Sequence, residues 1–412
     1  MTSDATASDL PLVVFDDQKG AFGPLTDLRA AFALRSGVGT LLESIEAALG
    51  ARAAALLVPD RLAALVGEQS GLPVNAAPAC DCLAVNGRLL DPRCLIGLPF
   101  KKGASFVDAA GTLVAAVLPG GTLGAAPPQA AANATTIAAR LANAPWDLTA
   151  AVGDTLAADL AAFGATRLSG SATRHLRPDE GQSFGAERIV IHPTATLGPL
   201  CVIDASKGPV VIGAGVTVRP FAVLVGPCAV LDGSTVAERA LIKSGTVVGP
   251  QCRVGGEIGS TIFQGFSNKS HDGHLGDSFV GEWVNIGAGT DNSNLLNTYG
   301  EVIVRLEPDG GLVKTGRQFW GSILGDHVKL AIGTRLMTGT TVGTGAMVAQ
   351  STPPASLVAR FAWCVDGGDG PRAFRFEKFM DTVRAMMSRR GCAPGPALEA
   401  ALRALHAKAT GA

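Results

Sequence analysis

The C-terminal half of the chain repeats an aliphatic residue at every sixth position. The first run of the repeat comprises Ile212, Val218, Leu224, Val230, Val236, Ile242, Val248 and Val254, and the second comprises Leu324, Leu330, Leu336, Val342 and Val348. A six-residue period is typical of a parallel β-helix, in which each short strand points one side chain inward and three strands complete a coil. β-Sandwiches and β-propellers lack this period, so we predict a solenoid.

The rest of the chain suggests three further parts. Its 412 residues are enough for two or three domains. Ahead of the repeat, short apolar runs that resemble buried strands accompany a helix-like segment, which predicts an α/β domain. Alanine-rich stretches at 130–143 and 147–163 have a helical pattern, and an amphipathic pattern follows the repeat. We therefore expect an α/β domain over 1–125, a helical connector over 126–187, the β-helix over 188–358 and C-terminal helices over 359–412.

The composition argues against several kinds of partner. The formal net charge is −1, which gives no basis for binding nucleic acid or an acidic membrane surface. No apolar run reaches the length of a transmembrane helix and the N-terminus lacks a signal-peptide pattern, so we expect a cytoplasmic protein. The eight cysteines form no CxxC pair, which argues against a zinc site or a disulfide framework.

A polar, histidine-containing segment separates the two runs of the repeat. It includes Asn268-Lys-Ser-His-Asp-Gly-His274 and, further on, Asn285-Ile-Gly-Ala-Gly-Thr290. Histidine suits proton transfer because the pKa of imidazole lies near neutral pH. Polar residues at solenoid corners also form structural hydrogen-bonded ladders, so these residue types alone leave a catalytic and a structural role open.

These motifs resemble those of a known family. His271-Asp-Gly-His274-Leu-Gly-Asp277, followed at the same spacing by Asn285–Thr290, is similar to the active-site stretch of the bifunctional enzymes that acetylate glucosamine-1-phosphate and then join the product to UTP. The divergent form of this family carries GGEIG, SNKxHDG, GEWxNxGAGT and NTYG, all present here, and the resemblance covers most of 185–350. It implies a left-handed β-helix, a homotrimer and acetyl-CoA as co-substrate.

The resemblance also implies roles for single residues. His271 corresponds to the general base that takes a proton from the attacking amine. His274, which stands where the family has Tyr, corresponds to a sugar contact, and Asn285 and Asn294 correspond to sugar-phosphate contacts. The backbone of Gly287, Ala288 and Gly289 corresponds to the part that approaches the acetyl-CoA thioester, where an amide can polarise the carbonyl oxygen.

One departure concerns the phosphate of the acceptor. The two positions at which the family places an Arg and a Lys to hold this phosphate are occupied here by Leu241 and Gly259. Lys243 and Lys269 are the substitutes we predict, with Arg239, or Lys314 and Arg317 from a long insert at 295–321, as alternatives. The acceptor therefore need not be glucosamine-1-phosphate. Because the active sites of such trimers lie between subunits, the insert or the C-terminal helices could complete the site.

The N-terminal domain resembles the opening of the same divergent family and, more weakly, sugar nucleotidyltransferases. In those enzymes a glycine-rich loop leads into Pro-Leu-Thr and cradles phosphates with backbone amides, and Pro24-Leu-Thr26 matches it here. The cations available for a nucleoside triphosphate are Lys19, Arg29 and Arg35. Arg88 stands where nucleotidyltransferases place an aspartate that binds Mg²⁺, so Asp16 and Asp17, or Asp91, are the candidate ligands if this metal is used.

Three functional hypotheses follow. The first is an enzyme of amino-sugar nucleotide biosynthesis that acetylates an amino sugar-1-phosphate in the β-helix and transfers a nucleotidyl group in the N-terminal domain. The second is a nucleotidyltransferase whose β-helix serves only as a trimerisation scaffold. The third is a non-catalytic trimer that binds a nucleotide sugar. It is favoured by Ala31, which stands where sugar nucleotidyltransferases have the Lys of a Pro-Lys pair, and by Arg88 and Gly259 at the positions described above.

Overall fold

The computed structural model describes residues 10–76, 78–122, 124, 126–163, 174–177, 179–367 and 370–411. Their packing defines two compact units. The first runs to Phe22 and continues over Leu28–Ala144 and Gly395–Ala401. The second consists of Gly23–Asp27, Pro145–Pro394 and the residues from Leu402 onward. The predicted domain boundaries at 125, 187 and 358 remain predictions.

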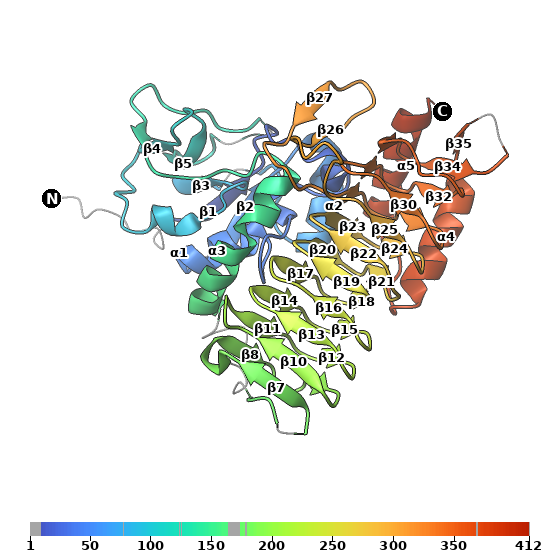
Figure 1. Ribbon diagram of the computed structural model, residues 1–412. Helices are drawn as coiled ribbons and strands as arrows, with labels where there is room; N and C mark the ends of the chain where they lie inside the picture. Colours follow the sequence, from blue (N-terminus) through green and yellow to red (C-terminus); the bar gives the residue numbers. More distant parts are fainter. Residues whose placement is uncertain are drawn as a thin grey trace. The chain divides into compact units, whose positions relative to one another are not determined.

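The first unit is an α/β domain, as the apolar runs of its sequence predicted (Figure 1). Its sheet has the strand order β2 (Ala53–Leu57), β1 (Leu12–Phe15), β3 (Cys82–Asn86), β5 (Leu113–Leu118), β4 (Ser105–Val107) and β6 (Thr135–Thr136). Helices α1 (Leu41–Leu49) and α2 (Asp60–Ser70) and the 3₁₀ helices η3 (Ala31–Ala33) and η4 (Pro92–Leu95) connect the strands. Because β1 pairs with β2 and β3 in parallel, the carboxyl ends of these strands meet at one edge.

The stretch 130–143 is not the helix that its alanine content predicted. Its regular structure is strand β6, which pairs in parallel with β4 so that Thr135 is opposite Phe106. Helix propensity is a weak preference of less than about 1 kcal/mol per residue, and pairing at a sheet edge overrides it here. The second alanine-rich stretch is helical, as α3 (Pro145–Phe163).

The second unit is a parallel β-helix with three faces. The first face comprises β7 (Gly181–Phe184), β10 (Cys201–Asp204), β13 (Val223–Val225), β16 (Leu241–Ile242), β19 (Glu257–Gly259) and β22 (His274–Gly276), with β25 (Asp291–Asn292) and β30 (Arg335–Leu336) beyond them. The second comprises β8 (Ile189–Ile191), β11 (Val210–Ile212), β14 (Cys228–Val230), β17 (Thr246–Val248), β20 (Ile262–Gly265), β23 (Phe279–Glu282), β28 (Ile323–Leu324), β31 (Thr341–Val342) and β33 (Leu357–Val358). The third comprises β9 (Thr196–Leu197), β12 (Thr217–Val218), β15 (Thr235–Val236), β18 (Arg253–Val254), β21 (Asn268–Lys269), β24 (Asn285–Ile286), β29 (Lys329–Leu330), β32 (Met347–Ala349), β34 (Ala362–Val365) and β35 (Arg372–Ala373).

The six-residue repeat forms the core of this β-helix, which confirms the predicted solenoid. Equivalent anchors stack from coil to coil, so that Val218 pairs with Val236 and Val236 with Val254. All the repeat residues are at most 2% exposed. Full burial of one such aliphatic side chain contributes about 1.5–3 kcal/mol, so the stacked columns supply much of the stabilisation of this unit.

The coils that carry the polar segment depart from the regular repeat. In the third face, β21 places Lys269 opposite Val254, in the column that aliphatic side chains fill elsewhere. In the second face, Phe279 pairs with Ile323, because the insert leaves the solenoid between these residues and returns to it. The insert contains the antiparallel hairpin of β26 (Ile303–Arg305) and β27 (Leu312–Lys314).

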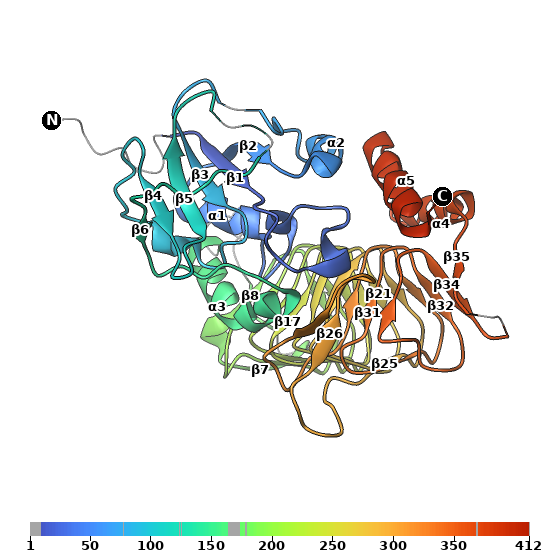
Figure 2. The same ribbon diagram turned by 90° about the horizontal axis from the view of Figure 1, so that it is seen from above.

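Three helices accompany the coils. Helix α3 packs on β14, β17 and β23, where Trp146 meets Trp320 edge to face at 5.5 Å. Helix α4 (Phe376–Ser388) lies at the end of the solenoid at which β32 and β34 are found, and α5 (Pro396–Thr410) follows it (Figure 2). Within the described part of the chain, none of the helices combines the length and the hydropathy that a membrane span needs.

Candidate active site

A cavity of about 660 Å³ lies between the third face of the β-helix and α4. His271, Asn285, Gly287 and Ala288 line it on the side of the coils. Thr382, Ala385 and Met386 of α4, with Arg389 and Arg390 after it, line the opposite side. The structure therefore brings together the predicted general base, one predicted sugar-phosphate contact and part of the predicted thioester site, and it adds a C-terminal helix to them.

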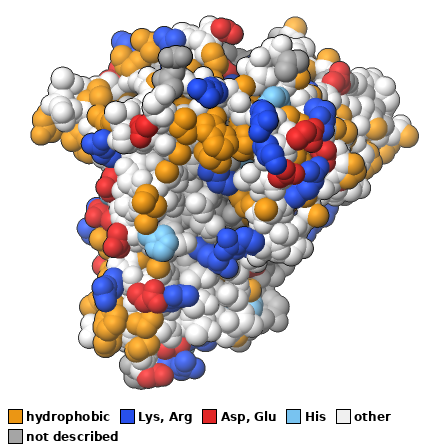
Figure 3. All heavy atoms as spheres, turned by 90° about the vertical axis from the view of Figure 1, so that its right-hand side faces the viewer, with side chains coloured by type: hydrophobic (Ala, Val, Ile, Leu, Met, Phe, Trp, Pro, Cys, Tyr) orange, Lys and Arg blue, Asp and Glu red, His pale blue; other side chains and the backbone are white. Residues whose placement is uncertain are grey.

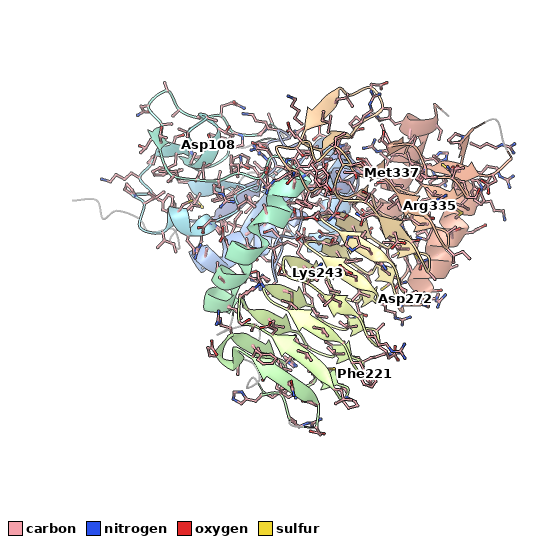
Figure 4. All side chains as sticks on the ribbon, in the orientation of Figure 1. Asp108, Phe221, Lys243, Asp272, Arg335 and Met337 are labelled. Carbon is pink, nitrogen blue, oxygen red and sulfur yellow. The ribbon has the colours of Figure 1, made fainter. Side chains whose placement is uncertain are left out.

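His271 occupies a corner of the solenoid, between β21 and β22. Its side chain is exposed to the cavity, and its neighbour Asp272 marks this corner on the side of α4 (Figure 4). The carbonyl of Asp272 accepts a hydrogen bond from the amide of Gly289 at 3.0 Å. This bond ties the histidine corner to the Gly-Ala-Gly turn of the next coil and fixes their separation.

The glycines of that turn have a structural reason to be glycine. A Cβ on Gly287 would lie 2.5 Å from backbone atoms of Ala331 and Ile332 in the next coil, and Gly289 adopts a φ of +66°. A side chain at Gly287 would separate the coils, and a positive φ is strained for other residues. The turn can therefore bring the backbone of Ala288 close to the cavity only with glycines on both sides.

A second polar group lies on the first face of the β-helix, where Figure 4 shows Lys243 away from the Asp272 corner. The Nζ atom of Lys243 is 3.0 Å from Oε1 of Glu257, and Nδ1 of His274 is 3.5 Å from the same oxygen. Next to them, Nδ2 of Asn294 donates to Oδ2 of Asp277 at 2.6 Å. Three predicted substrate contacts, Lys243, His274 and Asn294, thus lie together, with two acidic residues that the sequence argument did not single out.

The two carboxylates of this first-face group titrate in opposite directions. The hydrogen bond from Lys243 lowers the pKa of Glu257 and outweighs its partial burial. Burial raises the pKa of Asp277, against the hydrogen bond from Asn294 and the nearby charges of His274, Lys243 and Arg317. Arg317 belongs to the insert, so the insert contributes positive charge near this group.

Lys269 does not have the role that the sequence suggested for it. Its side chain is 1% exposed, and Nζ donates to the carbonyls of Gly255 at 3.3 Å and His271 at 3.1 Å. An ammonium held inside the coil by carbonyls is not available to a substrate phosphate. Lys269 instead fastens the histidine corner to the preceding coil.

The variant Lys269→Met tests this assignment. Burial lowers the pKa of the Lys269 ammonium to about 8, against the attraction of Asp291 and Asp272. The unfolded chain then binds this proton more tightly than the folded one, so the free energy of unfolding rises with pH from about 8 towards the unfolded value of about 10.4. We expect Lys269→Met to weaken this rise in urea denaturation, whereas Lys243→Met, at a half-exposed position, keeps it. An identical rise in Lys269→Met and the wild type would contradict the assignment.

In the first unit, the carboxyl ends of β1 and β3 are joined by a buried ion pair. The guanidinium of Arg88 binds both oxygens of Asp17 at 2.7 Å, and Nδ2 of Asn86 donates to Asp17 at 3.0 Å. Nη1 of Arg88 also donates at 2.7 Å to the Ala142 carbonyl and to Oδ1 of Asn143. Burial opposes ionisation of Asp17, but the bonds from Arg88 and Asn86 outweigh it and keep the pKa below its usual range.

This arrangement does not fit the predicted metal site. Asp16 accepts hydrogen bonds from the amides of Ala31 and Gln18, each at 2.8 Å, while Asp17 is taken up by Arg88. Mg²⁺ prefers free carboxylate oxygens together with water. Among the described residues, moreover, no three His, Cys, Asp or Glu side chains are grouped so as to hold a metal ion. A guanidinium here fills the place between these strand ends that the resemblance assigns to a metal ligand.

The predicted nucleotide cations differ in their surroundings. Lys19 is exposed, and its amide donates to Oδ1 of Asp17 at 3.2 Å. Arg29 and Arg35 are buried, and Arg35 donates to the carbonyl of Val38. Because Arg29 and Arg35 are buried, their side chains would have to move to contact a triphosphate. Lys19, which is exposed near the ends of β1 and β3, could contact one without such a movement.

The segment Gly23–Asp27 belongs to the second unit. Its 3₁₀ helix η2 (Gly23–Thr26) packs on β28, and Asp27 accepts from Nε of Arg360 at 2.7 Å and from Thr344 at 2.6 Å. Arg360 also binds both oxygens of Glu307 in the insert, at 2.6 and 2.8 Å. The Pro-Leu-Thr motif therefore has a packing role in this structure.

Comparisons with known proteins agree with the predicted resemblance. Residues 12–167 match the family model described as sugar nucleotidyl transferase. The bifunctional protein GlmU of Nostoc sp. is 30% identical over 45% of this chain and 38% of its own length, and that of Acidovorax ebreus is 30% identical over 42% and 34%. The chain thus spans little more than a third of these curated relatives. A solved structure of UDP-N-acetylglucosamine acyltransferase from Francisella novicida is 16% identical, with a TM-score of 0.30, over 52% of this chain and 73% of that one. Parts of the chain are therefore similar to sugar nucleotidyl transferases and to the bifunctional GlmU proteins.

Proposed function

We propose that this relative of the GlmU proteins is a transferase that moves an acetyl group from acetyl-CoA to the amine of a phosphorylated amino sugar at the His271 cavity. The observation that carries the proposal is the convergence of His271, Asn285, Gly287 and Ala288 on one cavity of about 660 Å³. Such a volume lies within the range of small-molecule sites.

The chemistry needs one base and one electrophilic contact. His271 takes a proton from the sugar amine as the amine nitrogen attacks the thioester carbonyl, which forms the C–N bond. An amide of the Ala288 turn stabilises the negative charge on the carbonyl oxygen. The C–S bond then breaks, and the imidazolium returns the proton to the leaving thiolate, so that CoA leaves as the thiol.

The position of His271 supports this mechanism. The ring is exposed at a corner whose backbone is fixed by the Lys269 and Gly289 bonds, so the base is accessible to substrate but its separation from the turn is constrained. Positioning of the reacting groups supplies a large part of enzymatic rate acceleration. His271 meets this requirement, because its corner is hydrogen-bonded to the glycine turn of the next coil.

The test is release of free thiol from acetyl-CoA in the presence of an amino sugar. We would compare glucosamine-1-phosphate, other amino sugar phosphates and unphosphorylated glucosamine. Thiol release that depends on a phosphorylated amino sugar supports the proposal. Its absence for every acceptor, in a protein that remains folded by circular dichroism, counts against it.

The match of residues 12–167 to sugar nucleotidyl transferases supports a second activity, the binding or transfer of a nucleotide by the first unit. We propose that Lys19 contacts the phosphates of that nucleotide and derive no step that requires a metal between Asp16 and Asp17. Pyrophosphate release from UTP or dTTP with a sugar-1-phosphate would support transfer. It should persist in His271→Ala and fall in Lys19→Ala.

A further inference from the structure

Three arginines line the same cavity, and no carboxylate does. Arg253 comes from β18, and Arg389 and Arg390 follow α4. In the part of the chain that the structure describes, none of the three forms a salt bridge with an acidic side chain. Figure 3 shows Lys and Arg side chains, with Asp and Glu side chains among them, on the face of the second unit that carries the C-terminal helices.

The outward side chains of the third face place these cations in order. Arg253 is opposite Asn268 on the neighbouring strand, and Asn268 is opposite Asn285. Adjacent strands are separated by about 4.8 Å. Nη2 of Arg390 donates to Oδ1 of Asn268 at 2.8 Å, which brings the end of α4 onto this ladder. Arg253 and Arg390 therefore meet around Asn268.

Like charges gathered in a partly closed space repel one another. Burial lowers the pKa of Arg390, and the charges of Arg253 and Arg389 lower it further. An anion bound between the guanidinium groups would remove this repulsion, and guanidinium binds phosphate oxygens with paired N–H donors. The charge pattern of the cavity is thus that of a site for phosphate.

We propose that Arg253, Arg389 and Arg390 bind the phosphate or diphosphate group of a substrate, which rests on the proposed function in that the substrate enters the His271 cavity. Asn268 precedes His271 by three residues, so their Cα atoms are at most about 10 Å apart. A phosphate beside Asn268 lies within reach of a sugar whose amine faces His271. The three arginines supply the cations that Leu241 and Gly259 cannot.

The first-face group is a poorer phosphate site. Lys243 is paired with Glu257, and Asp277 lies close by. A phosphate there would meet two acidic side chains, whereas the cavity offers three guanidinium groups without one. This difference separates the proposal from the sequence prediction that Lys243 holds the acceptor phosphate.

Calorimetric titration with inorganic pyrophosphate tests the site without requiring turnover. We expect pyrophosphate to bind the wild type in a salt-sensitive manner. Arg253→Gln and Arg389→Gln should each weaken binding by about tenfold, the loss typical of one charge-assisted hydrogen bond. Arg335→Gln is the matched control, because Arg335 is an exposed solenoid arginine outside the cavity. Equal affinity in all four folded proteins would overturn the proposal.

The source of the phosphate is identified by a second titration of the double variant Arg253→Gln/Arg389→Gln. Glucosamine-1-phosphate and CoA are compared, with glucosamine and pantetheine as their counterparts without phosphate. The ligand whose affinity falls to that of its counterpart supplies the phosphate. If neither affinity falls, the arginines do not serve a substrate and the proposal is wrong. A His271→Ala protein that still transfers acetyl groups but binds pyrophosphate normally would refute the proposed function and leave this site intact.

Discussion

Replacement of His271 by Ala is expected to lower the rate of thiol release from acetyl-CoA by about 10²- to 10⁴-fold. This range is the usual contribution of a positioned general base. Without the imidazole, the amine must lose its proton to water during attack, while binding in the cavity is largely retained. The loss should therefore appear mainly in kcat, with a small change in KM. The measurement is the steady-state rate with the best acceptor found in the acceptor comparison.

His192→Ala is the control for this experiment. His192 also lies at a corner of the solenoid, where Nδ1 contacts Oγ1 of Thr194 at 2.8 Å, but it is outside the cavity. Its replacement should leave the rate close to that of the wild type, because His192 contributes no group to the cavity. Unchanged transfer in His271→Ala would show that another group removes the proton. His274, beside Glu257, would then be the next variant to measure.

Replacement of Arg88 by Ala is expected to destabilise the first unit by about 3–5 kcal/mol. This is the usual effect of removing one partner of a buried ion pair, because the remaining charge is left in an apolar site. Arg88 is 1% exposed, and its loss would remove the donor of the Ala142 carbonyl and the only cation that binds Asp17 among the described contacts, leaving Asp17 the bonds from Asn86 and the Lys19 amide. Since the protein has two units, local stability is best measured by hydrogen exchange of peptides from β1 and β3.

The acid dependence of the same peptides gives an independent check. The pKa of Asp17 is lowered in the folded state, so its contribution to stability is present above the unfolded pKa and is lost as the pH falls through the folded pKa. The wild type should lose this protection in acid, and Arg88→Ala should already lack it at neutral pH. Arg93→Ala, which breaks an exposed pair with Asp91, should change protection by less than about 1 kcal/mol. Equal protection in Arg88→Ala and the wild type would contradict the role given to this pair.

The architecture of the second unit could be predicted because the six-residue repeat records its core directly. The predictions were wrong at two places where the sequence pattern does not match the local structure. Lys269 occupies a core column. From the sequence alone a lysine is expected at the surface, because the carbonyls that accept hydrogen bonds from its ammonium are visible only in the structure. The stretch 130–143 has the composition of a helix, and only its pairing with β4 shows that it is not one.

Only the part of the candidate site that is formed by residues close in sequence could be predicted. The motifs identified His271, Asn285 and the glycine turn because these lie close in sequence on successive coils. Arg253 and Arg390 are separated by a long stretch of chain and meet only because α4 folds back onto the third face. The two adjacent arginines after an amphipathic helix were the available signal, but nothing in the sequence indicates where that helix packs.

The insert can change in length without changing the stacking of the coils. Its ends are held together by the bond from the Trp320 amide to the Asn294 carbonyl at 2.9 Å and by the bridge between Leu295 and Phe319, so the coils on either side stack as if it were absent. Residues can be added to or lost from the interior of such a loop without disturbing the register of the core. The insert residues next to Asn294 and Asp277 can therefore differ between related proteins while the β-helix stays the same.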